Sequence, residues 1–222
     1  MQHELIVLPD AAAVSKAAAE HVAKAARDAV AERGVFSMAV SGGRSPWAMF
    51  ADLAELDMPW ESVELYQVDE RIAPEGDPLR NLTHLREALG PQLPVQIHPM
   101  PVNDDDPQRG ARDYAGELPT TIDLIHLGLG PDGHTASLVP GDPILDVTDQ
   151  LVAVTGGEYQ GTHRMSMTYP ELAKCRSLLW LLTGDDKRKP LQKLLAGDPS
   201  IPAGRVTAPA SVILADTAAH PA

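Results

Sequence analysis

The sequence has one cysteine, Cys175, and no long run of apolar residues. A single cysteine excludes a disulfide within the chain, and with it a disulfide-stabilised extracellular framework. No apolar run approaches the length of a membrane-spanning helix, and the first residues lack the basic and apolar segments of a signal peptide. We therefore expect a cytoplasmic protein without a membrane partner. Because no base stands beside Cys175, we expect its thiol to be buried and structural.

Basic residues are also scarce in this chain. The 18 Lys and Arg residues are outnumbered by 31 Asp and Glu residues, and the resulting net charge of −13 argues against nucleic-acid binding. The patterns H-E-x-x-H and C-x-x-C are missing, so we expect no zinc site. There is also no Walker sequence, no G-x-G-x-x-G and no G-x-S-x-G. Nucleotide binding is therefore not implied, and a serine-hydrolase triad is disfavoured.

The order of apolar runs and helix-like segments predicts the fold class. The 222 residues, 44% of them hydrophobic, suffice for one large domain but not for two. Alternating strands and helices predict an α/β fold: a single three-layer domain over residues 1–222, with a mostly parallel, Rossmann-like sheet and helices on both faces. The predicted strands are 5–8, 35–40, 63–68, 122–127, 177–182 and 212–214, with weaker candidates at 95–98, 151–154 and 164–167; the predicted helices are 10–32, 46–56, 81–89, 107–118 and 186–196. We expect a disordered tail at 218–222.

The most informative segment is G-P-D-G-H-T-A-S-L-V, residues 130–139, which follows the apolar run 122–129. Glycines let the backbone turn sharply and approach a ligand closely, and His134 can act as a base near neutral pH. Asp132 is near enough in sequence to orient the imidazole. The alternative interpretation is a Pro-Asp-Gly turn that carries an incidental histidine.

Two further strand ends carry polar residues. S-G-G-R-S-P, residues 41–46, joins a strand to a helix; we expect Ser45 to cap that helix and Arg44 to offer a charge to a phosphate, although an ordinary tight turn is equally compatible. V-D-E-R, residues 68–71, could by itself be a solvated charge run. Because the carboxyl ends of parallel strands meet at one edge of a sheet, we expect these loops to lie together.

These segments, in this order, resemble the 6-phosphogluconolactonases, a family within the larger group that includes the glucosamine-6-phosphate deaminases. The resemblance continues at residues 162–168, 182–187 and 209–211 and covers about 4–216. The chain departs from the family pattern at Arg80, where a serine is usual before Asn81. It departs from the deaminases at Val139, where they carry a glutamate.

The resemblance implies a fold like that of glucosamine-6-phosphate deaminase. It also implies hydrolysis of 6-phospho-D-glucono-1,5-lactone to 6-phosphogluconate, in the oxidative branch of the pentose phosphate pathway, without a metal or organic cofactor. Our hypothesis is that His134 activates water as general base, that Asp132 orients the imidazole or binds sugar hydroxyls, and that Arg71 stabilises the developing oxyanion or holds the substrate. The predicted substrate and phosphate contacts are Gly42, Gly43, Arg44, Ser45, Asp69, Asn81, Gly130, Gly133, Arg164 and Lys187. Asp69 could equally form a salt bridge with an arginine.

Two other functions stay open at this point. One is an amino-sugar-phosphate deaminase or isomerase, which Val139 disfavours. The other is a non-catalytic sugar-phosphate-binding domain, although the chain offers no basic helix-turn-helix to accompany it. We expect a monomer or weak homo-oligomer, and a site made attractive to an anion by local cations that include Arg188. His126, on the apolar run, is expected to be a core histidine with its hydrogen bonds satisfied.

Overall fold

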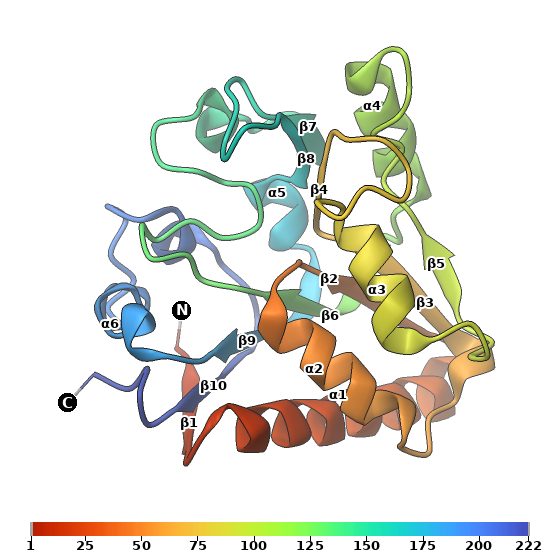
Figure 1. Cartoon of the computed structure of the whole chain (residues 1–222), viewed down its shortest axis with the longest axis vertical. Helices are drawn as coiled ribbons and strands as arrows, with labels where there is room; N and C mark the ends of the chain where they lie inside the picture. The colour runs from red at the N-terminus through yellow and green to blue at the C-terminus, as the bar shows by residue number, and fades with distance from the viewer. Residues whose placement is uncertain (1, 222) are drawn as a thin grey trace.

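A seven-stranded parallel sheet forms the centre of the computed structural model, which describes residues 2–221 (Figure 1). Its strand order is β1-β10-β9-β6-β2-β3-β5, and every neighbouring pair in it is parallel. The strands are β1 Glu4–Leu8, β2 Phe36–Val40, β3 Val63–Gln67, β5 Gln96–His98, β6 Ile122–Leu127, β9 Cys175–Leu182 and β10 Ser211–Asp216. The predicted α/β fold with a mostly parallel sheet is confirmed.

Helices cover both faces of this sheet. The helices are α1 Ala11–Arg33, α2 Arg44–Ala54, α3 Asn81–Leu89, α4 Pro107–Glu117, α5 Tyr169–Leu172 and α6 Arg188–Leu195, with short 3-10 turns at Trp60–Ser62, Pro143–Asp146, Asp185–Lys187 and Pro202–Arg205. One buried cluster joins the sheet to α1, α2 and α3, and a second joins it to α4, α5 and α6. Two apolar faces on one sheet explain why its central strands read as continuous apolar runs.

The predicted helix boundaries follow from local capping. Asp10 caps α1 by accepting a 2.8 Å hydrogen bond from the N–H of Ala13, and α1 ends at Gly34, whose φ of 81° suits glycine. Asp106 caps α4 with Pro107 in its first turn. The short helix α5 was not predicted, since four residues carry too little periodicity to be recognised.

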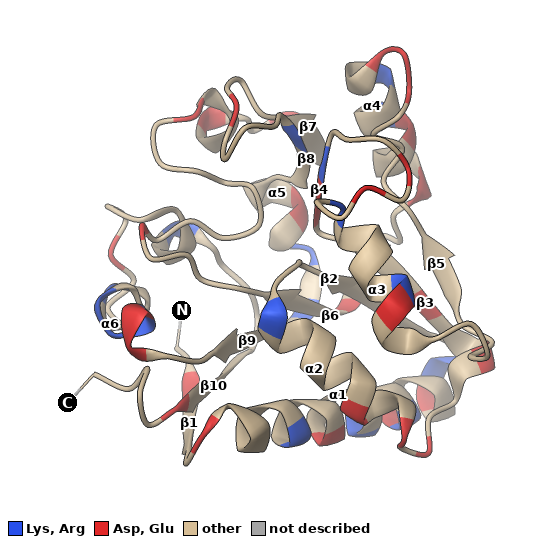
Figure 2. Ribbon diagram, in the orientation of Figure 1, with Lys and Arg blue, Asp and Glu red and all other residues tan. Residues whose placement is uncertain are grey.

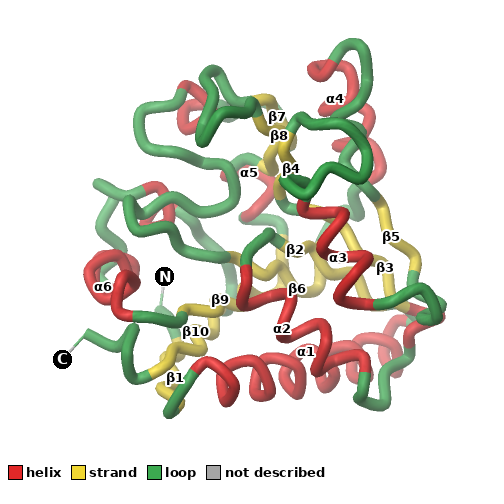
Figure 3. The backbone as a smooth tube through the Cα atoms, viewed as in Figure 1, coloured by secondary structure: helices red, strands yellow, loops and turns green. Residues whose placement is uncertain are grey.

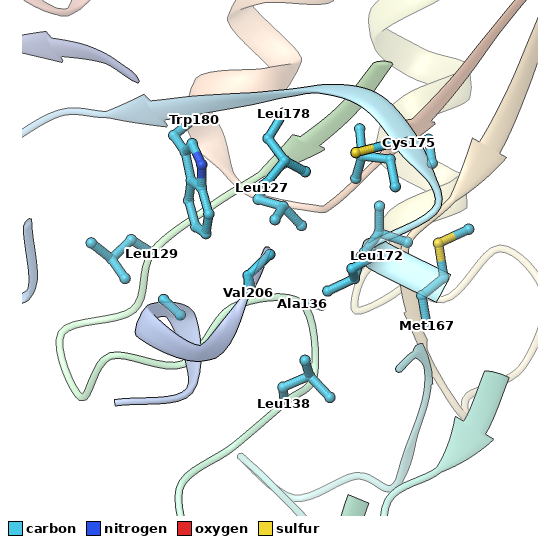
Figure 4. Packing of buried hydrophobic residues seen from close by; sticks show 14 of the residues in the cluster. Leu127, Leu129, Ala136, Leu138, Met167, Leu172, Cys175, Leu178, Trp180 and Val206 are labelled. Atoms are coloured by element: carbon cyan, nitrogen blue, oxygen red, sulfur yellow. The ribbon is translucent and has the colours of Figure 1, made fainter. Parts of the chain in front are cut away.

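The core beneath the functional loops is drawn in Figure 4. Trp180 and Leu178 extend from β9 toward Leu127 of β6 and Val206, which follows the last 3-10 turn. Cys175 lies in the same cluster with 2% of its surface exposed, and burial raises the pKa of its thiol to about 11. A thiol that stays protonated at neutral pH is a poor nucleophile, so Cys175 has the structural character expected of it.

Three short strands form a separate antiparallel sheet, β4-β8-β7, which Figure 3 shows apart from the main one. They are β4 Asp69–Arg71, β7 Val152–Val154 and β8 Arg164–Met167. The D-E-R segment is therefore a strand, where the sequence predicted the charged end of a strand. Val68 makes the transition, because its N–H donates to Val40 in the main sheet and its carbonyl accepts from Met167 in the small one. The pairing sets Arg71 opposite Arg164.

The C-terminal segment is ordered further than predicted. Ala219 is fully buried and its N–H donates to Asp216 Oδ1 at 2.7 Å, while Arg188 Nε donates to the carbonyl of Ala218 at 2.7 Å. The disordered tail predicted for 218–222 is therefore wrong for 218 and 219, and Ala222 lies outside the described residues. Between residues 2 and 221, no helix is long and apolar enough to cross a membrane.

Candidate active site

A cleft of about 280 Å³ opens at the carboxyl ends of the central strands, where the loops after β2, β6 and β9 meet the small sheet. This is the edge at which parallel α/β sheets bind ligands. Its lining includes every predicted site residue except Asp132 and Gly133. The lining residues are Ser41, Gly42, Gly43, Arg44, Ser45, Pro46, Asp69, Arg71, Asn81, His126, Gly128, Leu129, Gly130, Pro131, His134, Ala136, Arg164, Leu181, Thr183 and Lys187.

The loop after β6 presents His134 to the cleft with Asp132 behind it. Asp132 Oδ1 accepts hydrogen bonds from His134 Nδ1 at 2.5 Å and from the His134 backbone N–H at 3.1 Å. Burial acts to raise the pKa of Asp132, but the hydrogen bonds from His134 outweigh it, and the pKa is lowered. An ionised carboxylate on Nδ1 fixes the imidazole tautomer and leaves Nε2 as the basic nitrogen.

Two glycines give this loop its shape for different reasons. A Cβ on Gly130 would lie 2.0 Å from His134 Nδ1, so only glycine lets the imidazole pack over the backbone there. Gly133 has a φ of 84°, and a Cβ on it would lie 2.5 Å from Ile201. Its carbonyl accepts a 3.0 Å hydrogen bond from Ala203. Gly133 therefore packs against the last 3-10 turn and lies outside the cleft lining, although it was predicted to contact substrate.

The S-G-G-R-S loop ends at the N-terminus of α2. Gly43 is the N-cap residue, with a φ of 137°, and among residues 2–221 no side chain caps the helix. Ser45, the predicted cap, lies inside the first turn, and its hydroxyl is 3.2 Å from the Thr183 hydroxyl of the loop after β9. The first turn of α2 thus lines the cleft and its N–H groups have no side-chain cap within residues 2–221, which are the features of an anion-binding helix start.

Glu70 organises the neighbouring wall and was not predicted. It is fully buried, and its carboxylate accepts hydrogen bonds from the N–H groups of Asn81 and Leu82 at 2.8 and 2.9 Å, which caps α3. Arg80 Nε lies 3.1 Å from Glu70 Oε2, with both side chains almost inaccessible. The arginine that departs from the family pattern thus forms a buried ion pair. A Cβ on Gly42 would lie 1.9 Å from the Asn81 Oδ1, so glycine makes room for that amide.

Arg71, Arg164 and Asp69 form the charged wall beside it. Arg71 Nη1 donates to Asn81 Oδ1 and to the carbonyl of Leu79, both at 2.7 Å. Within residues 2–221, Arg71 and Asp69 do not form an ion pair. Burial raises the pKa of Asp69, an effect partly offset by a 2.7 Å hydrogen bond from Ser137 and by the charges of Arg71 and Arg164. Burial and the Arg71 charge lower the pKa of Arg164.

Cations from separate elements surround the cleft. Figure 2 shows basic segments at the start of α2 and on β4 and β8. Arg44 has no carboxylate within ion-pairing distance among residues 2–221, whereas Lys187 Nζ donates to Asp186 Oδ2 at 2.7 Å. Arg188, also expected near the site, points to Ala218 instead. In the described part of the chain, no group of three or more His, Cys, Asp or Glu residues could hold a metal ion.

One residue that lines the cleft, His126, and one that lies behind it, Tyr159, differ from what the sequence predicted. His126 is fully buried, as expected, and neither ring nitrogen reaches full hydrogen-bond geometry with a partner within residues 2–221, although the Ser41 backbone lies near enough to act on the ring. Burial lowers the pKa of His126 to about 3. Tyr159 was not considered, yet its hydroxyl oxygen lies 3.3 Å from Asp132 Oδ2. No local signal marks it, because it lies 25 positions after His134.

Comparison with known proteins shows the family to which the chain belongs. Residues 9–216 match the sequence profile of a family described as glucosamine-6-phosphate isomerases/6-phosphogluconolactonase. The chain belongs to this family. A curated relative from Synechocystis sp., named 6-phosphogluconolactonase, is 38% identical over 181 residues, which are 76% of this chain and 75% of the relative. The family resemblance predicted from the sequence is therefore confirmed.

Solved structures of the family share the fold. The crystal structure of 6-phosphogluconolactonase from Thermotoga maritima has a TM-score of 0.88, covers 97% of this chain and 100% of its own, and is 23% identical. A monomeric glucosamine-6-phosphate deaminase has a TM-score of 0.83 at 18% identity, covering 97% of this chain and 98% of its own. At these identities the likeness concerns the fold alone. It confirms the predicted deaminase-like fold and leaves the two activities to be separated by the site.

Proposed function

We propose that this chain hydrolyses 6-phospho-D-glucono-1,5-lactone to 6-phosphogluconate. The observation that carries the proposal is the Asp132–His134 pair, whose 2.5 Å contact commits Nδ1 and leaves Nε2 for a water molecule in a cation-lined cleft. The relative from Synechocystis sp. bears the name of this activity. Val139 supports the lactonase over a deaminase, because an alkyl side chain cannot move protons at the position where the deaminases carry glutamate.

The proposed reaction needs one base and one stabilised oxyanion. His134 Nε2 takes a proton from water as the water oxygen bonds to C1 of the lactone, and the carbonyl electrons move onto its oxygen. Arg71, which keeps donors beyond the Nη1 bonds to Asn81 and Leu79, stabilises that oxyanion. When the intermediate collapses, the bond between C1 and the ring oxygen breaks. The imidazolium returns its proton to the ring oxygen, which becomes the 5-hydroxyl of the product.

We assign the 6-phosphate to the N-terminus of α2. Gly42, Gly43 and Ser45 supply N–H groups there, and Arg44 and Lys187 supply charge. The contact between Ser45 and Thr183 supports this assignment, because it joins the loop of Arg44 to the loop of Lys187. Arg164 pairs in register with Arg71, so we assign it to the lactone end, together with Asn81 and Asp69. Gly130 shapes the loop around His134.

The decisive test compares wild type with His134→Ala in a coupled assay. Glucose-6-phosphate dehydrogenase and NADP generate the lactone, and 6-phosphogluconate dehydrogenase reports its opening, at slightly acidic pH where spontaneous hydrolysis is slow. Loss of a general base lowers kcat by about 10²–10⁴-fold. The matched control is His84→Ala, because His84 lies on α3 away from the cleft lining and bonds to Pro78 and Glu87.

Each result of this test discriminates among the functions. Acceleration by wild type and His84→Ala, with a folded but slow His134→Ala, supports the lactonase and the base. Equal acceleration by all three proteins would remove His134 from the mechanism. If none accelerates lactone opening, ammonia release from glucosamine 6-phosphate tests the deaminase. Binding of 6-phosphogluconate in a thermal shift, without any turnover, would identify a non-catalytic domain.

A further inference from the structure

Tyr159 is held at the tip of the β7–β8 hairpin by its local backbone. Its N–H donates to the carbonyl of Thr162 at 3.0 Å, and the two residues between them, Gln160 and Gly161, have φ values of 56° and 82°. Positive φ at both central positions defines the tight turn that suits the twist of a hairpin. Gln160 is strained in this left-handed conformation because it is not a glycine, so the surrounding contacts must fix it.

The hydroxyl of Tyr159 meets the proposed catalytic pair from behind. Its oxygen lies 3.3 Å from Asp132 Oδ2 and 3.3 Å from His134 Nδ1, and the ring packs edge-on to the imidazole with centroids 5.2 Å apart. Because Nδ1 already donates to Asp132 Oδ1 at 2.5 Å, the phenol proton goes to Oδ2. Burial, and next the charge of Asp132, raise the pKa of Tyr159, so the hydroxyl stays a donor at neutral pH.

The rest of the same residue holds Arg164. The guanidinium carbon of Arg164 lies 5.0 Å from the centre of the Tyr159 ring, a cation–π distance. Arg164 Nη2 donates to the backbone carbonyl of Tyr159 at 3.2 Å. Tyr159 itself is not among the residues that line the cleft, whereas His134 and Arg164 both are. Tyr159 therefore contacts two residues at the lactone end of the proposed site without lining the cleft itself.

We propose that Tyr159 is a positioning residue that aligns the base through its hydroxyl and the arginine through its ring and carbonyl. The inference rests on the proposed lactonase function. The hydroxyl donates a hydrogen bond to Asp132 Oδ2. This bond holds the carboxylate so that Oδ1 accepts from His134 Nδ1 and Nε2 points to the attacking water. The ring and carbonyl keep Arg164 extended over the lactone end of the cleft. Both roles require no chemical step at Tyr159.

The two roles separate in a pair of variants. Tyr159→Phe removes the hydroxyl and keeps the ring and carbonyl, so kcat falls by about tenfold, as expected for one hydrogen bond to a charged group, while KM stays within twofold. Without its donor, the Asp132 carboxylate favours protonated His134 more strongly, so the acidic limb of the kcat/KM profile moves to higher pH. Tyr159→Leu also removes the aromatic face, and KM rises by about fivefold in addition.

Tyr66→Phe is the matched control. The Tyr66 hydroxyl also donates to a carboxylate, Glu64 Oε2, at 2.8 Å, and its ring also packs on a histidine, His98, but on β3 and β5 away from the cleft lining. Removal of this hydroxyl leaves kcat, KM and the pH profile unchanged. Comparing Tyr159→Phe with Tyr66→Phe therefore distinguishes a general effect of losing a phenol–carboxylate hydrogen bond from the specific effect of losing it beside His134.

The outcomes are distinct from those of the function test. Inactive wild type overturns the proposed function itself. Active wild type with Tyr159→Phe equal to Tyr66→Phe in kcat and pH profile overturns the positioning role alone. A Tyr159→Phe variant with raised KM and unchanged kcat would place the hydroxyl on substrate binding and would also overturn it. Should Tyr159→Leu not fold, the phenylalanine variant still decides the alignment of the base.

Discussion

Replacing His126 with leucine removes a titratable group from the floor of the cleft. His126 lies on β6 between Val40 of β2 and Leu179 of β9, with none of its surface exposed. Burial lowers its pKa from 6.5 to about 3. Unfolding returns the ring to water and to its ordinary pKa. Between these two values the unfolded chain binds more protons than the folded one, so stability falls as the pH drops below 6.5.

The size of this effect follows from the two pKa values. At pH 7.5 the ring is neutral in both states and contributes almost nothing. At pH 5.0 it is protonated in the unfolded chain and neutral in the fold, which lowers the free energy of unfolding by about 2 kcal/mol. For a chain of this length the loss corresponds to a melting temperature roughly 4–8 °C lower. When the pH falls from 7.5 to 5.0, the free energy of unfolding of His126→Leu should therefore fall by about 2 kcal/mol less than that of wild type.

Urea unfolding at pH 7.5 and 5.0, followed by tryptophan fluorescence, measures this difference. Trp180 is fully buried and reports loss of the core. His84→Leu makes the same substitution on α3 and controls for the leucine and the buffer. His126→Leu can gain stability at both pH values, because it removes two unpartnered buried nitrogens; the pH-dependent part is the test. An identical gain at both pH values would refute the neutral, buried state of His126.

Two further substitutions test the charges of the cleft. Asp69→Asn should raise the free energy of unfolding at pH 7, because the raised pKa of Asp69 makes its ionised carboxylate unfavourable in the folded state. Urea titrations should show that this gain in stability grows as the pH rises above about 4 and vanishes below it. Lys187→Ala should raise KM for the lactone with little change in kcat, since phosphate binding is uniform along the reaction. The exposed Lys189→Ala is its control, and a large fall in kcat at constant KM would contradict the assignment.

The main sheet could be predicted because its signals are local. Strands β2, β6 and β9 are buried on both faces over most of their length, so each is recognisable as a mainly apolar segment whatever its neighbours are. The small sheet could not be predicted in the same way. Strands β4 and β7 have three residues each, and their pairing with β8 depends on a chain reversal that no periodic pattern encodes.

The residues of the candidate site were likewise predictable only where the signal in the sequence is local. His134 and Arg44, which both line the cleft, could be selected as candidates because glycine-rich turns surround them in sequence. Glu70 was missed because it caps α3 from another element. A signal was nevertheless present: the N-cap position of α3 is Arg80, which has no acceptor for the first-turn N–H groups. A helix that starts on an arginine must be capped from elsewhere, and the nearest preceding acids are candidates.

The acidity of the chain is compatible with the anionic substrate that we propose, because Asp69, the acid that lines the cleft, lies near Arg71 and Arg164, and two acids behind the cleft have partners of their own. Asp132 is matched by His134, and Glu70 by Arg80 and the N-terminus of α3. The remaining acids that give the net charge of −13 lie largely on the surface, where salt screens them beyond about 8 Å. The field inside the cleft is therefore set by the charged residues that line it, mostly cations, and the net charge of the chain alone gives the wrong sign for the substrate that we propose.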